Sequence, residues 1–179
     1  MFPARLLSTC LLAALLLLAG CSGPAPRDYA GTAPEFRLED YFDGEVRAWG
    51  VFRGRDGALQ RQFTVDILGR MEGDELVLEE DFRYRDGETE RRVWRIRPTG
   101  PQSYEGRAGD VVGEAQGEAH GSVLRWRYVL ALETDSGTWE LNFDDWMFLQ
   151  EDGVLLNQAE VSKFGFTVGE VLIAFQRRN

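Results

Sequence analysis

The stretch LVLEEDFRYRDGETERRVWRI at residues 76–96 carries the pattern that decides the fold. Its apolar side chains fall on alternate positions on either side of an Asp-Gly pair: Leu76, Leu78, Phe82, Tyr84, Trp94 and Ile96. A period of two is typical of a strand with one buried face, and Asp-Gly between two such runs is a hairpin signal. The stretch therefore predicts two antiparallel strands that share an apolar face.

The register of this hairpin follows from keeping its apolar residues together. A three-residue loop at 86–88 places Leu78 opposite Ile96 and Phe82 opposite Arg92. A two-residue loop would set both apolar residues opposite arginines, because a one-residue slip moves every side chain of a strand to the other face. We therefore predict the three-residue loop, in which Gly87 supplies the left-handed residue that such loops carry.

The same alternation of apolar and polar side chains extends in both directions from this hairpin. Runs punctuated by glycine-containing turns occupy 46–52, 60–68, 76–84, 90–96, 104–108, 111–119, 123–132, 138–149, 154–161 and 171–175. No long window shows a helical period, and short turns join antiparallel neighbours. We predict an all-β fold, an antiparallel up-and-down β-barrel of about 8 to 10 strands, whose interior can hold a small ligand. A two-sheet β-sandwich is the alternative.

Composition excludes several classes of function. The chain has 179 residues and a formal net charge of −10, which argues against nucleic-acid binding because phosphate contacts need a basic face. His120 is the single histidine, so most histidine-based metal sites and catalytic triads are excluded. We expect no metal, no cofactor and no enzymatic activity, because the chain offers no clear nucleophile–base pair.

The N-terminus looks like a targeting segment. One basic residue, Arg5, precedes an apolar run at 6–18, which is short for a membrane span. The quartet Leu18-Ala19-Gly20-Cys21 then resembles the bacterial lipobox. That resemblance implies cleavage before Cys21 and a lipid anchor on its sulfur, and Ser22 after it implies the outer membrane of a Gram-negative cell. An ordinary secretory signal is the alternative.

These features divide the chain into three parts. Residues 1–20 are the predicted lipoprotein signal peptide, 21–40 a proline- and glycine-containing lipidated tether, and 41–179 the barrel domain. The predicted location is the cell envelope, with the domain facing the periplasm and the membrane as the partner of Cys21.

Candidate site residues lie on the predicted inner face and beside it. The candidates for ligand binding are Phe82, Arg92, Trp94, Trp126, Tyr128 and Lys163. The tryptophans could line a cavity or fill a core. Glu80, diagonal to Arg92 in the predicted register, could form an internal ion pair or meet a ligand headgroup. The adjacent Asp144 and Asp145 could be structural carboxylates, often at a bulge, or a cation site.

Several segments together resemble an envelope lipoprotein family of proteobacteria catalogued only as a domain of unknown function, DUF family 3833. The matching segments are 41–44, 48–50, 80–87, Arg92 with Trp94, 109–113, Trp126 with Tyr128, 143–147 and 157–170. Asp144-Asp145-Trp146-Met147 and Lys163-Phe164-Gly165 are the most specific of these, and Ser122 departs from an expected asparagine. The shape is also similar to that of lipocalins, although their Gly-x-Trp signature is missing around Trp49.

Two functions follow as expectations. The first is an outer-membrane-anchored barrel that binds a lipid or another apolar small molecule. The second is a structural or assembly lipoprotein with a filled core and a protein partner. Whether the barrel is hollow discriminates between them.

The anchor rests on Cys21 and can be tested by cell fractionation. A Cys21→Ala variant should be absent from the outer-membrane fraction, because no thioether lipid can form without the sulfur. A variant that fractionates like the wild type would refute the lipobox interpretation.

Overall fold

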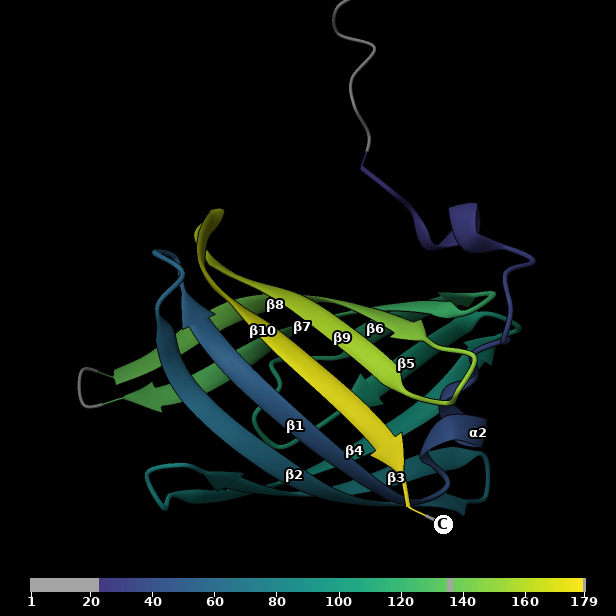
Figure 1. Ribbon diagram of the computed structural model, residues 1–179, viewed down its shortest axis with the longest axis horizontal. Helices are drawn as coiled ribbons and strands as arrows, with labels where there is room; N and C mark the ends of the chain where they lie inside the picture. Colours follow the sequence, from purple (N-terminus) through teal and green to yellow (C-terminus); the bar gives the residue numbers. More distant parts are fainter. Residues whose placement is uncertain (1–22, 135–136, 179) are drawn as a thin grey trace, which may run out of the picture.

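Ten antiparallel strands form a closed barrel (Figure 1), in a computed structural model that describes residues 23–134 and 137–178. The strands are β1 (Gly44–Gly54), β2 (Leu59–Glu72), β3 (Glu75–Tyr84), β4 (Thr89–Gly100), β5 (Ser103–Arg107), β6 (Ala115–His120), β7 (Val123–Thr134), β8 (Gly137–Leu149), β9 (Leu155–Lys163) and β10 (Phe166–Arg177). Each pairs with its neighbour in sequence, and β1 pairs with β10 from Val46↔Arg177 to Gly54↔Gly169. The predicted up-and-down barrel is confirmed, and the two-sheet alternative is wrong because the sheet closes on itself.

The β3–β4 hairpin has a three-residue loop, but one residue earlier than predicted. The Tyr84 amide donates to the Glu88 carbonyl at 2.9 Å, so the loop is 85–87, with Gly87 at a φ of 93°. Glu80 therefore lies directly opposite Arg92, and Phe82 opposite Glu90. The predicted pairing was wrong by two residues. A shift of two keeps every side chain on its face, so the apolar pattern could not distinguish the two registers.

A short helix closes one end of the barrel. Helix α2 (Leu38–Phe42) lies at the right of Figure 1. Its apolar side chains and that of the preceding Phe36 are buried at this end of the barrel. The Tyr41 hydroxyl donates to the carbonyls of Gly153 and Phe175 at 3.1 Å each. The backbone of Phe42 approaches Gly69 so closely that a Cβ there would lie 1.8 Å from the Phe42 carbonyl oxygen. Glycine at 69 thus allows the helix to seal the barrel.

The segment before α2 packs on the outer wall. A 3-10 helix, η1 (Pro26–Tyr29), contacts β6 and β7, and Tyr29 meets Trp146 and Phe148 edge-on at 6.2 and 6.3 Å between centroids. Most of the stretch from 23 to 40 therefore covers the barrel, where the sequence had predicted only a tether. Isolated buried residues such as Phe36 have no period to reveal their packing. No helix in the described residues is long and apolar enough to cross a bilayer.

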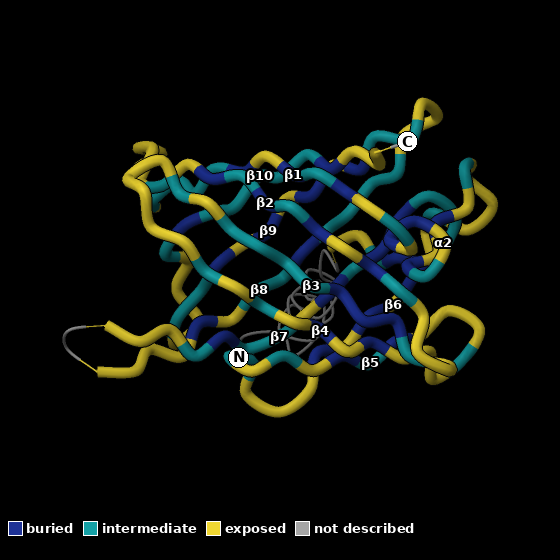
Figure 2. Tube along the Cα trace, turned by 90° about the horizontal axis from the view of Figure 1, so that it is seen from below, coloured by how far each residue is buried: buried dark blue, intermediate teal, exposed yellow. Residues whose placement is uncertain are grey.

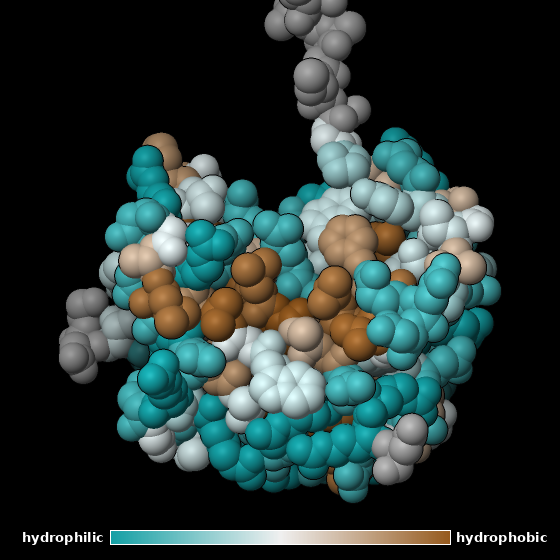
Figure 3. All heavy atoms as spheres, viewed as in Figure 1, coloured by the Kyte–Doolittle hydropathy of each residue, from teal (hydrophilic) through white to brown (hydrophobic). Residues whose placement is uncertain are grey.

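Burial alternates along the strands, as Figure 2 shows. Outward positions carry many arginine–carboxylate pairs, such as Asp66 with Arg47 and Arg83. The exception is an apolar band on the face of β1, β10, β9 and β8 (Figure 3), formed by Trp49, Val51, Leu172, Ala174, Leu156 and Phe148. We call these six residues the outer band.

The close approach of α2 to β2 predicts a specific sensitivity. Gly69→Ala should lower the free energy of unfolding by about 2 to 3 kcal/mol, because a methyl group at this site overlaps the α2 backbone. Chemical unfolding followed by tryptophan fluorescence measures the change. Gly109→Ala is the control, since nothing lies within 4 Å of a Cβ at that position. Equal effects of the two substitutions would contradict the packing argument.

Candidate ligand site in the barrel interior

The barrel is hollow. A cavity of about 540 Å³ extends from Leu38 and Phe42 of α2, the helix that plugs one end, to Thr89 and Glu133 near the opposite end. Ten strands make a ring wider than side chains alone fill, which is the physical reason for the empty space. Its volume lies within the range of small-molecule sites, roughly 300 to 1,000 Å³.

Aromatic side chains from β4, β7 and β8 form one wall of the cavity. Trp94 meets Trp126 and Tyr128 edge-on at 5.7 and 5.4 Å between centroids, and Tyr128 stacks on Phe143 at 4.9 Å. Trp126 lies flat against two glycines: a Cβ at Gly106 or Gly117 would approach its ring to 2.6 or 2.5 Å. These glycines make room for the indole, which explains why β5 and β6 show so little apolar pattern.

A polar cluster interrupts this apolar lining. Arg92 on β4 donates to Asp110 from Nε at 2.8 Å and pairs with Glu90 at 3.0 Å. Glu80 faces Arg92 across the β3–β4 ladder, but the ion pairs of the guanidinium are with Glu90 and Asp110. The predicted Glu80–Arg92 ion pair is therefore corrected: Glu80 acts on Arg92 only at longer range.

Asp144 and Asp145 point to opposite faces of β8, and the ladder to β7 runs through them without a bulge. Asp144 accepts two hydrogen bonds from Arg125 on the outer wall, at 2.7 and 2.5 Å. Asp145 is buried inside, where the Asn157 amide donates to it at 3.4 Å. Because they lie on opposite faces, the two carboxylates cannot share a cation, and β8 has no bulge at this point.

Burial makes two of these carboxyl groups weak acids. It raises the pKa of Glu80 to about 7, against the lowering effect of the Arg92 guanidinium. It also raises the pKa of Asp145 to about 7, although the Asn157 amide favours the charged form. Both groups can therefore exchange a proton near neutral pH, and both offer oxygen atoms to a hydrogen-bond donor in the cavity.

The structure places most of the predicted site residues together. Phe82, Arg92, Trp94, Trp126 and Tyr128 all line the cavity, and so do Glu80 and Asp145. Lys163 does not: its Nζ lies 3.5 Å from the centroid of the Trp139 ring. The prediction that Lys163 is a ligand-binding residue of this cavity is corrected, because the β8–β9 ladder brings the end of β9 alongside β8 rather than over the opening.

Sequence reasoning missed three polar residues of the cluster. Asn157 shares the inward face of β9 with Leu155, Ala159 and Val161, so its alternation could have revealed it. Glu90 lies on the same face of β4 as Arg92. Asp110 sits in the loop between β5 and β6, where no strand pattern exists, and backbone bonding of its carbonyl to Ala131 places it over β7.

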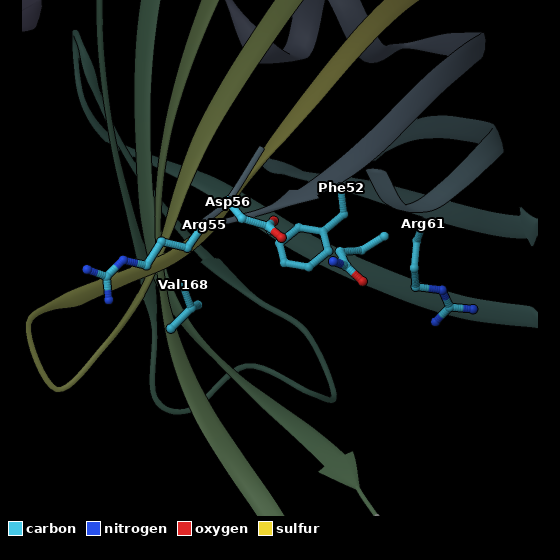
Figure 4. A pocket seen from close by; sticks show the side chains of 7 residues that line it. Phe52, Arg55, Asp56, Arg61 and Val168 are labelled. Carbon is cyan, nitrogen blue, oxygen red and sulfur yellow. The ribbon is translucent and has the colours of Figure 1, made fainter. Parts of the chain in front are cut away.

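Another hollow lies at the rim of the barrel, beside the β1–β2 turn. It is lined by Phe52, Gly54, Arg55, Asp56, Gln60, Arg61 and Val168. Arg55 and Arg61 point away from one another on either side of Phe52 (Figure 4). This hollow is open to solvent and has no enclosed polar group, so the barrel interior is the stronger candidate site.

A closed antiparallel barrel with a hollow, mostly apolar interior defines a lipocalin-like protein. Within this class, the chain belongs to the protein family of unknown function DUF3833, whose model matches residues 15–177. The family predicted from the sequence segments is thus confirmed over nearly the whole chain.

The fold has relatives among solved structures. One is the S-type phycobiliprotein lyase CPES from Guillardia theta, with a TM-score of 0.59 and 8% sequence identity over 87% of this chain and 99% of that chain. At this identity the likeness shows the fold alone. No curated protein sequence matches the chain.

The buried carboxyl groups predict how stability depends on pH. Because the folded protein retains protons on Glu80 and Asp145 that the unfolded chain releases at lower pH, stability should fall as pH rises through about 7. Between about pH 5 and pH 8, the free energy of unfolding of Asp145→Asn should decrease by on the order of 2 kcal/mol less than that of the wild type.

Thermal unfolding at a series of pH values measures this dependence. Glu160→Gln is the control, since Glu160 is exposed on β9. An unchanged pH profile in Asp145→Asn would mean that Asp145 titrates normally in the folded protein.

Proposed function

We propose that this protein is an outer-membrane lipoprotein, anchored through Cys21 and facing the periplasm, that binds a lipid or another apolar small molecule inside its barrel. The observation that carries the proposal is the hollow interior with its aromatic wall. We propose binding rather than catalysis. The lyase activity named for the Guillardia theta protein belongs to that protein.

The energetics favour an occupied cavity. Contact with Phe63, Trp94, Trp126 and the aliphatic lining would remove apolar ligand surface from water at about 25 cal/mol per Å². The plug at α2 keeps water and ligand from passing through the barrel, so entry is from the end at Thr89 and Glu133. This is the arrangement expected of a carrier with one mouth.

The anchor and the barrel wall are close along the chain. Cys21 precedes η1 by five residues, which span roughly 17 Å when extended. A lipid on Cys21 would therefore hold the outer wall near β6 and β7 close to the bilayer surface. A carrier held there could collect an amphiphile from the membrane.

The outer band favours a second candidate function, that of a structural or assembly lipoprotein with a protein partner. Trp49 and Leu156 in this band are 47% and 43% exposed. Neighbouring apolar side chains exposed to this extent are typical of a surface that binds another molecule. In this alternative the band would bind the partner, and the cavity would be incidental.

Binding of N-phenylnaphthylamine, a neutral apolar fluorophore, tests the carrier function. The unlipidated domain should bind it saturably with enhanced fluorescence. Val171→Trp, which adds bulk on the inner face of β10, should weaken binding at least about tenfold. Val51→Trp, on the outer face of the adjacent β1, is the matched control and should leave binding unchanged.

Two results would count against the carrier. If the probe does not bind saturably, the cavity takes no apolar ligand. If Val51→Trp weakens binding as much as Val171→Trp, the probe occupies the outer band and the second candidate gains support.

A further inference from the structure

The charged residues in the mostly apolar wall of the cavity are predominantly acidic. Six acidic side chains line it, and two basic ones: Glu80, Glu88, Glu90, Asp110, Glu133 and Asp145, with Arg61 and Arg92. Arg61 is engaged at the rim, where it pairs with Glu88 at 2.5 Å and Asp86 at 3.3 Å. The excess of carboxyl groups makes the interior unfavourable for an anion.

Arg92 is not available to a ligand carboxylate. Its guanidinium contacts Asp110 at 2.7 and 2.8 Å and Glu90 at 3.0 Å, and its side chain is only 14% exposed. An anion that took one of these contacts would have to displace a carboxylate that already pairs with the guanidinium, Glu90 or Asp110. Arg92, a predicted ligand-binding residue, therefore lines the cavity with its charge already paired.

The cavity also contains acceptors that lack donors. Asn157 is 6% exposed, its Nδ2 is used by Asp145, and its Oδ1 has no hydrogen-bond partner. Oδ1 of Asp110 has none either. Within the described residues, Glu80 and Asp145 have no basic nitrogen within 4 Å. A buried acceptor without a donor is costly, so the Oδ1 atoms of Asn157 and Asp110 call for a donor that the protein does not supply.

From this arrangement we propose that the interior binds a molecule with an apolar body and a cationic, hydrogen-bond-donating nitrogen, such as a protonated long-chain amine. This inference rests on the proposed carrier function and names its ligand class. The nitrogen would lie among Glu80, Asp145 and Asn157, and the body along Phe63, Val65 and Trp126.

The aromatic wall suits such a ligand as well. Trp94 and Tyr128 line the cavity together with the two carboxyl groups. Burial, with Asp145 and Glu80 nearby, raises the pKa of Tyr128 well above its usual value, so its ring is neutral. Aromatic faces attract a desolvated cation. A cation beside Glu80 and Asp145 would also favour their ionised forms, so binding near neutral pH should release protons.

A comparison of three ligands with one chain length tests the inference. Decylamine, decanol and decanoate, each below its micellar concentration, are used to displace N-phenylnaphthylamine from the wild-type domain at pH 7.5. Decylamine should bind at least about tenfold more tightly than decanoate, a difference of about 1.4 kcal/mol, and more tightly than decanol.

The outcomes separate this inference from the proposed function. If the fluorophore itself does not bind, the carrier function fails. If the fluorophore binds and decanoate or decanol competes as well as decylamine, only the cationic ligand class is overturned.

A double variant locates the preference within the cavity. Glu80→Gln with Asp145→Asn should abolish the preference for decylamine over decanol, measured as the ratio of the two affinities in the same variant. Glu160→Gln, an exposed carboxylate on the outer face of β9, should retain the preference. A preference that persists in the double variant would place the cation elsewhere and overturn the assignment.

Discussion

The interior of this protein depends on the backbone hydrogen bonds between β1 and β10. These two strands close the sheet along nine residue pairs, from Val46↔Arg177 to Gly54↔Gly169. Closure removes both sheet edges, and with ten strands it also sets a circumference too large for side chains to fill. The cavity is thus a consequence of how many strands the chain supplies before its ends meet.

A wide barrel needs one end sealed, and small residues make this possible. Gly69 admits the backbone of α2, and Gly106 and Gly117 admit the flat face of Trp126. The bulky aromatic residues can therefore stand against the wall instead of across the lumen. Polar groups then remain inside at a cost, visible in the raised pKa values of Glu80 and Asp145 and in the unpaired oxygen of Asn157. Such costs are typical of sites kept for binding.

Much of the fold and part of the site could be read from period-two alternation. The ten runs correspond to the ten strands, and Phe82, Trp94, Trp126 and Tyr128 share the inner face as predicted. Alternation failed where a feature has no period. Contacts between distant segments decide three such features: the burial of Phe36, the hydrogen bond from Arg92 to Asp110, and the position of Lys163 over the Trp139 ring.

The sequence by itself determined the strands and the side of the sheet that each strand residue occupies, because both depend on local spacing along the chain. Only the tertiary structure decided which charges meet inside. The β3–β4 register, shifted by two residues, sets Glu80 opposite Arg92, and the β5–β6 loop brings Asp110 to that arginine. A shift of two residues keeps the apolar pattern but changes the cross-strand partner of every residue. The charged contacts in the cavity therefore depend on the register, which local spacing along the chain does not determine.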